Sequence, residues 1–306
     1  MYASQISNDL FKWIKESEKK GEIHSIFKST VNILSEDGKF IPILINDKPM
    51  SPFSLKLDKI LDFKDMDIQI GDKVIFTKNY LKVDNVTIRY DNAISWDNSI
   101  RLDNNVDSLE NIKLKLNIVK KHIREKGNKE GIFRLMQLIP FDLYNGNDNI
   151  LDSSQIFIKE RFENFVKAFI NNNIKEINTL SKKIIGFGPG LTPSMDDFLS
   201  GMMIANLYVS HYLKLSIEDA YSINKQIVYN IDNKTTRVSE EMLKQSSIGE
   251  TNEDIRNLMV RIIGISNNQL SDLLEKVINF GHSSGTDILC GIYIGSCILI
   301  QRYEEN

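Results

Sequence analysis

The stretch SMDDFLSG, at residues 194–201, recurs ninety positions later as SGTDILCG, at residues 284–291. Both segments fit the pattern Ser-x-x-Asp-x-Leu-x-Gly, and each runs into a strongly apolar stretch. Ser-x-x-Asp is typical of a helix start, where side-chain oxygens accept hydrogen bonds from backbone N–H groups that have no partner inside the helix. The repeat therefore predicts two similar buried helices that begin near residues 194 and 284.

A glycine stands inside each of these helices, at Gly201 and Gly291. Glycine in a helix costs about 1 kcal/mol relative to alanine, so something should compensate. We expect the two helices to cross closely at these glycines. Such a crossing would bring both N-termini toward one pocket, together with Asp196, Asp197 and Asp287.

The first helix start follows a glycine-rich loop, IGFGPGLTP, at residues 185–193. Thr192 suits the N-cap position, and Pro193 suits the first helical position because it has no N–H to leave unpaired. Glycines let a backbone approach a ligand closely, and the partial positive charge of a helix start favours an anion. We expect a phosphate or carboxylate to bind here. The residues predicted to bind it on this side are Gly188, Gly190, Leu191, Thr192 and Ser194.

The second helix start follows the sequence GHSSG at residues 281–285. Ser283, Ser284 and Gly285 are predicted to bind the ligand, the serines as hydrogen-bond donors because they lack the setting of a catalytic nucleophile. His282 is a candidate for acid–base catalysis, since a helix start favours its neutral form. A lone histidine in a capping loop is more often structural, and both interpretations stay open.

The three aspartates Asp196, Asp197 and Asp287 are candidate catalytic residues. Gathered in one small volume, they would either bind Mg²⁺ through oxygen ligands or leave one carboxyl with a raised pKa, ready to act as a general base. No histidine or cysteine adds a metal-ligand pattern, so we favour proton transfer or substrate orientation and assign no cofactor. Arg237 is a candidate clamp for a carboxylate or phosphate, although an exposed helical arginine is the commoner case.

Plain helix capping is the structural alternative for both motifs. The shared Leu-x-Gly and the glycines ahead of both helix starts favour a functional site over capping alone. The loop at 185–193 lacks the Lys-Ser/Thr pair of a P-loop, and no acidic residue follows at the spacing of a dinucleotide-binding fold. A small-molecule kinase remains a distant alternative, because Pro193 interrupts the run of small residues that its loop would use.

The rest of the chain predicts an α+β protein, with an N-terminal antiparallel β-barrel or sandwich-like domain and a mostly α-helical domain after it. We place the two domains at residues 1–100 and 101–306, because the apolar period changes from two to 3.6 near Trp96. The first residues, up to about 20, read as a short amphipathic helix with Leu10, Phe11 and Ile14 inward. Further helices are expected at 106–126, 153–172, 196–212, 217–231, 235–246, 252–263, 269–279 and 286–302.

The composition limits the function classes. A formal net charge of −3 and a pI near 5.9 argue against nucleic-acid binding. The apolar runs 198–209 and 288–300 are shorter than the roughly 18 residues that span a bilayer, so no membrane is expected. The only cysteines, Cys290 and Cys297, lie two turns apart on one predicted helix and should not form a disulfide. Together with the lack of a signal-peptide pattern, this predicts a cytoplasmic protein.

The sequence resembles the AllH-like family, which has been linked to oxamate carbamoyltransferase. The likeness covers about residues 22–302 and is carried by Ile23–Phe27 with Val31-Asn32, by Gly186–Leu199, and by Gly281–Asp287. Met195 is a departure, because it stands where we expect the family's glycine-rich signature to have a glycine.

The resemblance implies a subunit that works beside other carbamoyltransferase subunits in the breakdown of purine-derived nitrogen such as allantoin. The reaction would exchange a carbamoyl group between oxalurate, oxamate and phosphate, all of them small anions that helix N-termini can bind. Backbone N–H groups after Gly190 and Gly285 would stabilise charge on the carbamoyl oxygen. Two alternatives stay open: a metal-assisted hydrolase or phosphotransferase that uses the aspartates, and a non-catalytic assembly subunit.

Overall fold

The computed structural model describes residues 1–59, 62–101, 105–141, 143, 151–265 and 269–305. The chain divides into two compact units. One unit holds Met1–Ser99 together with Thr251–Glu253, and the other holds Ile100–Glu250 and Asp254–Asn306.

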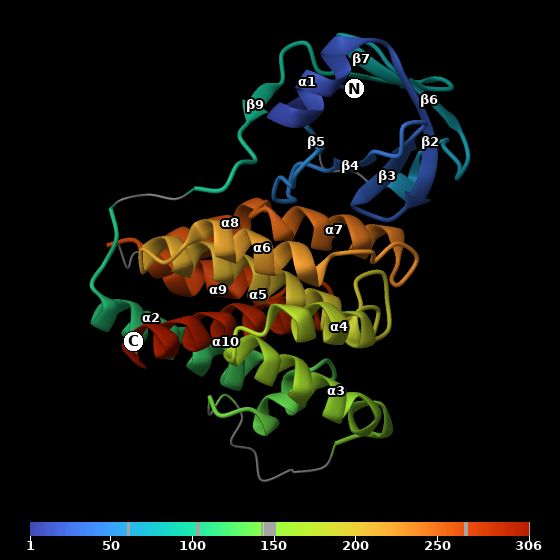
Figure 1. Cartoon of the computed structure of the whole chain (residues 1–306). Coiled ribbons are helices and arrows are strands. Elements are labelled where there is room, and N and C mark those ends of the chain that lie inside the picture. Colours follow the sequence, from blue (N-terminus) through green and yellow to red (C-terminus); the bar gives the residue numbers. More distant parts are fainter. Residues whose placement is uncertain (60–61, 102–104, 142, 144–150, 266–268, 306) are drawn as a thin grey trace. The chain divides into compact units, whose positions relative to one another are not determined.

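Within its described residues, the first unit is built on one curled sheet of nine strands, ordered β8-β7-β6-β2-β3-β4-β5-β1-β9 (Figure 1). Neighbouring strands are antiparallel except in the pairs β4–β5 and β1–β9. The strands are β1 Ala3–Ser7, β2 Lys19–Ile26, β3 Thr30–Ser35, β4 Phe40–Leu44, β5 Leu55–Leu57, β6 Lys73–Phe76, β7 Tyr80–Val83, β8 Val86–Arg89 and β9 Ile94–Trp96. A short 3-10 helix, η1, spans Phe63–Asp65.

Alternating side chains explain why these segments form strands. In β6 and β7 every second residue is buried, so one face of the sheet supplies the core while the other faces solvent. Helix α1, Asn8–Glu16, buries Leu10, Trp13 and Ile14. The ring of Trp13 meets Phe53 and Phe76 edge-on, with ring centroids 5.7 Å apart in both pairs.

The N-terminal residues differ from expectation. Residues 3–7 form strand β1 and not the beginning of a helix, which starts only at Asn8. The strand exists because β1 pairs with β5 on one side and β9 on the other, contacts that no local helical period can reveal. The α+β class, with a mostly antiparallel β region followed by a helical region, is confirmed.

The second unit is helical. Its helices are α2 Leu109–Lys126, α3 Ser153–Ile170, α4 Ile174–Ile184, α5 Ser194–Tyr212, α6 Ile217–Ile227, α7 Arg237–Ser247, α8 Glu253–Ile263, α9 Leu270–Ile278 and α10 Ser284–Glu305, with the short 3-10 helix η2 at Phe133–Leu138. Helix α4 and η2 lie outside the predicted helices. The other boundaries fall within a few residues of expectation, as is usual for helix ends.

Helices α5 and α10 run side by side through the middle of this unit, with the other helices around them (Figure 1). Every residue of α5 from Ser194 to Ser210 is buried, and so is most of α10. A helix that is apolar on all sides belongs in a core. By length and composition α10 would pass for a membrane span, one such helix among the described residues, but 83% of its apolar window is buried inside the protein. The burial of α10 inside the protein therefore explains its apolar composition.

The two helices touch at the predicted glycines, and they do so reciprocally. A Cβ atom on Gly201 would lie 2.1 Å from the backbone oxygen of Ile288, and one on Gly291 would lie 2.1 Å from the backbone oxygen of Phe198. Phe198 and Ile288 are themselves ninety positions apart. The repeat in the sequence is therefore a repeat in space, and the predicted crossing is confirmed.

Alanine substitutions at these glycines test this packing. Alanine is the better helix former by about 1 kcal/mol, yet Gly201→Ala and Gly291→Ala should each lower the free energy of unfolding by roughly 2 kcal/mol or more, because the methyl group meets backbone. Gly295→Ala in the same interface is the matched control, since a Cβ there would lie 3.1 Å from the Ala205 side chain and 3.3 Å from the Met202 backbone, which a small shift relieves. Urea denaturation measures all three, and equal stabilities would contradict the close crossing.

Candidate functional site

The starts of α5 and α10 meet through four hydroxyl groups. Thr192 Oγ1 lies 3.2 Å from Ser284 Oγ, and Ser194 Oγ lies 3.4 Å from Ser283 Oγ. Each pair joins one helix start to the other. Two of the predicted binding segments, ninety residues apart in the chain, are thus in direct contact.

The cap of α5 differs from expectation. Pro193 occupies the N-cap position, and no side chain caps the helix. The predicted cap, Thr192, turns its hydroxyl to Ser284 on the other helix. The glycine-rich loop folds back instead, so that the Met195 N–H donates to the Phe187 oxygen at 3.0 Å and a Cβ on Gly188 would lie 2.6 Å from the Ser194 nitrogen. The φ of +120° at Gly188 also favours glycine.

Behind the hydroxyls lie two carboxyl groups, Asp197 and Asp287, each no more than 1% exposed. Asp287 Oδ1 accepts a hydrogen bond of 2.9 Å from the Ile132 N–H. The Oδ2 atom of each carboxyl is buried without a hydrogen-bond partner. Since unpaired buried polar atoms are costly, this pair of oxygens is unusual and requires an explanation.

Burial changes the acidity of both carboxyls. It raises the pKa of Asp287 to about 7, although the Ile132 N–H and the neighbouring Ser194 and Ser283 hydroxyls act to lower it. Burial also raises the pKa of Asp197 well above its ordinary value, the charge of Asp287 adds to this, and the Ser284 and Thr192 hydroxyls oppose it. These hydroxyls stand beside the carboxyls without satisfying either Oδ2 atom. The pKa of each carboxyl is therefore influenced by hydroxyl groups from both helix starts.

Asp196 has a different environment. Its carboxylate accepts hydrogen bonds from the Gly186 N–H at 2.7 Å, the Thr235 hydroxyl at 2.5 Å and the Ser239 hydroxyl at 2.6 Å. It therefore ties the glycine-rich loop to the start of α7. Both oxygens of Asp196, a candidate catalytic residue, are thus occupied by hydrogen bonds made inside the protein.

A segment outside the predicted site residues lies beside the two helix starts. Residues 127–132, GNKEGI, follow α2 and lie against the start of α10. The Asn128 N–H donates to Thr286 Oγ1 and its side-chain amide to the His282 oxygen, both at 2.9 Å. A Cβ on Gly131 would lie 2.3 Å from Asp287 Oδ1, so only glycine lets this backbone cover the carboxyl. The composition of the segment is that of an ordinary loop after a helix and carries no signal of this role.

The remaining predicted residues lie at or near the same helix starts. The side chain of His282 is 76% exposed, and its Nε2 lies 2.5 Å from a Glu130 carboxylate oxygen. Gly285 is buried, and a Cβ there would lie 2.0 Å from the Val277 oxygen, so close packing alone requires glycine at this position.

Three further predicted binding residues are Gly190, Leu191 and Arg237. Gly190 and Leu191 are exposed, and the Leu191 oxygen accepts a hydrogen bond from Thr236. The guanidinium of Arg237 pairs with Glu240 at 2.8 Å and with Glu241 at 3.3 Å on its own helix.

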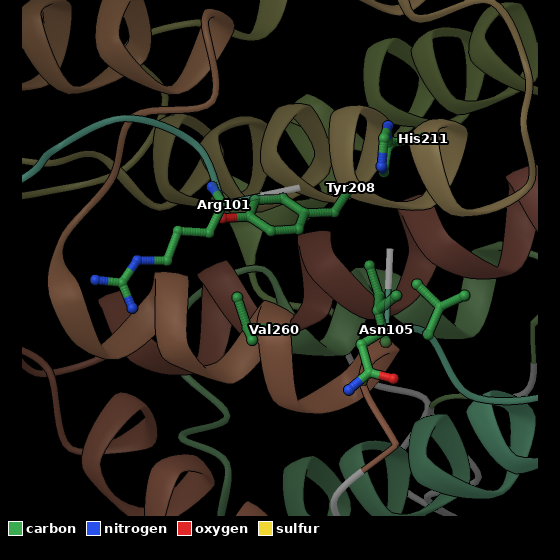
Figure 2. A pocket seen from close by; sticks show the side chains of 8 residues that line it. Arg101, Asn105, Tyr208, His211 and Val260 are labelled. Carbon is green, nitrogen blue, oxygen red and sulfur yellow. The ribbon is translucent and has the colours of Figure 1, made fainter. Parts of the chain in front are cut away.

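A cavity elsewhere in this unit is too small to hold a substrate. It has a volume of about 30 Å³, room for about one water molecule, and is lined by Arg101, Asn105, Val106, Tyr208, His211, Val260, Ile263 and Gly264. Figure 2 shows the guanidinium of Arg101 pointing away from His211 and Asn105. At 1.5 Å per residue, His211 is roughly 25 Å along α5 from Ser194. Among the described residues, no group of three His, Cys, Asp or Glu side chains is arranged to hold a metal ion.

Comparison with known proteins matches both units. A family model described as oxamate carbamoyltransferase subunit AllH matches residues 184–296, a range that begins at the glycine-rich loop and takes in both helix starts. A second model, described as the AllH family N-terminal domain, matches residues 2–95. The search of solved structures finds no match.

Removing the Asp196 carboxylate should destabilise the protein. Asp196→Ala leaves three donors without an acceptor, one of them buried and two partly buried, and we expect a loss of about 3 kcal/mol or more in the free energy of unfolding. Asp219→Ala is the matched control, because Asp219 stands at the same position of α6 but is exposed. A loss no larger than that of the control, measured by urea denaturation, would contradict the structural role of Asp196.

The stability of the protein should also depend on pH through Asp287. Its folded-state pKa of about 7 lies above the ordinary 3.8, so the stability it confers is complete below about pH 4 and is lost as pH rises through about 7. Each pKa unit corresponds to about 1.4 kcal/mol. Asp287→Asn, which cannot ionise, should therefore be more stable than the wild type at pH 8 by a few kcal/mol and lose less stability between pH 5 and 8. Parallel pH profiles in urea denaturation would refute this.

Proposed function

The chain belongs to the AllH family of oxamate carbamoyltransferase subunits, and from this premise we propose that the paired starts of α5 and α10 bind the small anions of a carbamoyl transfer. The observation that carries the proposal is the contact of the two starts through Thr192 and Ser284 and through Ser194 and Ser283. Two helix N-termini add their partial positive charges at one place, where a phosphate or carboxylate is stabilised.

The hydroxyl groups suit the ligand's oxygens. Thr192, Ser283 and Ser284 are partly exposed, whereas the carboxyls behind them are buried. A hydroxyl can donate to an anion in front of it and accept a hydrogen bond from behind. We propose that these side chains, with Ser194 and the loop residues Gly188, Gly190 and Leu191, contact oxalurate, oxamate, phosphate or carbamoyl phosphate.

Carbamoyl transfer needs charge stabilisation and a place for one proton. When the amide nitrogen of oxamate attacks the carbamoyl carbon of carbamoyl phosphate, a C–N bond forms and the C–O bond to the leaving phosphate breaks. Negative charge grows on the carbamoyl oxygen, and the attacking nitrogen must lose a proton. Donors from the helix starts would stabilise that charge. Asp197 and Asp287 lie beside the hydroxyls, and His282 stands exposed at their edge, so these three remain our candidates for handling the proton.

Two of the predicted residues are less suited to direct contact with substrate. Asp196 already accepts three hydrogen bonds, and Arg237 is paired with two glutamates of its own helix. We propose that Asp196 shapes the glycine-rich loop. With Asp196 occupied, no specific observation favours the alternative of a metal-assisted hydrolase or phosphotransferase that uses the aspartates as a cluster.

The family's description as a subunit indicates a multi-subunit enzyme. We propose that partner subunits contribute to catalysis, so binding is a better first test of this chain than turnover. A cytoplasmic location is also proposed, because Cys290 and Cys297 are both free thiols on α10 and carbamoyl transfer acts on small metabolites.

Ligand binding tests the proposal. We expect oxamate, phosphate or carbamoyl phosphate to raise the melting temperature of the chain and to bind in calorimetry. Ser284→Ala should weaken binding about tenfold or more, because a hydrogen bond to a charged group is worth roughly 1.5–3 kcal/mol. Ser296→Ala is the control, as its hydroxyl donates to the Ile292 oxygen of its own helix α10 at 2.7 Å. If none of the three ligands binds, the chain is better described as an assembly subunit.

A further inference from the structure

The environment of Asp287 differs on its two oxygens. Oδ1 is held by the Ile132 N–H, and the backbone at Gly131 lies against the carboxyl. The Gly131 oxygen is fixed in turn by the side-chain amide of Gln155, at 3.0 Å. Oδ2 is buried without a partner. The carboxyl is thus oriented by one oxygen, while the other stands beside the Ser194 and Ser283 hydroxyls without a hydrogen bond from either.

The titratable groups around Asp287 provide no cation paired with its carboxyl. Asp197 of α5 faces it from the other helix, and its own Oδ2 is also unpartnered. The Cys290 thiol lies on the same helix, and burial first and then the charge of Asp287 raise its pKa well above its ordinary value. Glu130 and His282 pair with each other at the exposed edge. Among the described residues, neither Asp197 nor Asp287 has an ion-pair partner.

We propose that Asp287 is a positioning residue that holds a proton for this site, so that a small anion binds at the paired helix starts together with one proton. The inference rests on the proposed function. Two adjacent carboxyls buried without a cation cannot both be ionised at low cost. A proton on Oδ2 removes that cost and turns this unpartnered atom into a hydrogen-bond donor.

The proton sets the direction of the hydroxyl groups. With Oδ2 protonated, Asp287 donates to the oxygen of Ser194 or Ser283, and that hydroxyl donates outward to the anion. With Asp287 ionised, the same hydroxyl donates inward to the carboxylate and presents a lone pair outward, which repels an anion. No bond other than O–H···O contacts changes, and the proton comes from solvent.

The pKa of Asp287, raised by burial to about 7, puts this exchange in the neutral range. Above that pH the empty site loses the proton, and an anion must bring it back in order to bind. The affinity for an anion should therefore fall by up to about tenfold for each pH unit above about 7. Below about pH 6 it should level off.

Calorimetry of oxamate and of sulfate, whose charges do not change between pH 6 and 9, measures the proton directly. Titrations at pH 8 in two buffers of different ionisation enthalpy should show uptake approaching one proton per bound anion. Asp287→Asn keeps the acceptor at Oδ1 and places an N–H donor at Oδ2, so it should bind with no uptake and with an affinity that does not change with pH. Asp219→Asn, exposed in the first turn of α6, should behave as wild type.

The outcomes separate this inference from the proposed function. Binding without proton uptake and with a flat pH profile overturns the proton on Asp287 and leaves the anion site in place. Absence of binding for both anions overturns the proposed function, and a second measurement then decides the proton. Carboxyl ¹³C shifts of the ligand-free protein, assigned by the resonance lost in Asp287→Asn, should titrate near neutrality. A midpoint near 4 would overturn the inference.

Discussion

The contact of glycine with backbone carbonyl between α5 and α10 is the interaction on which the helical unit depends. Gly201 meets the oxygen of Ile288, and Gly291 meets the oxygen of Phe198, in a reciprocal arrangement. Without side chains at these two points, the helix backbones approach closely, and the apolar residues on either side pack at the density of a protein interior. The same approach brings the hydroxyls of the two helix starts into contact, so the geometry of the site follows from the packing of the core.

Much of this arrangement could be predicted from the sequence because its signals are local. The repeated Ser, Asp, Leu and Gly positions and the costly glycines inside apolar helices indicate a close pair of helices with adjacent starts. The 127–132 segment could not be predicted in the same way. Its bond from Ile132 to Asp287 joins residues 155 positions apart, and a polar loop with two glycines is the ordinary end of a helix such as α2. Strand β1 is similar, since its partners lie far along the chain.

Neighbouring aspartates show why a residue type alone does not decide a role. Asp196 and Asp197 are adjacent, but successive residues of a helix point about 100° apart. Asp196 therefore meets Thr235 and Ser239 near the start of α7, whereas Asp197 lies beside the hydroxyls at the start of α10. One carboxylate receives donors for both oxygens, and the other retains an unpartnered oxygen. The difference depends on where α7 and α10 lie, which the motif itself does not contain.

The ninety-residue separation of the two central helices also affects how the chain is made. Helix α5 is buried from Ser194 to Ser210, yet its principal partner is α10, which is synthesised much later. At typical rates of translation the delay is on the order of ten seconds, far longer than helices need to form. During that time α5 can pack against smaller partners such as α6 and α7, but the face that α10 covers stays without its partner. A nascent chain of this kind is a natural client for chaperones that shield hydrophobic segments until the second half of the repeat arrives.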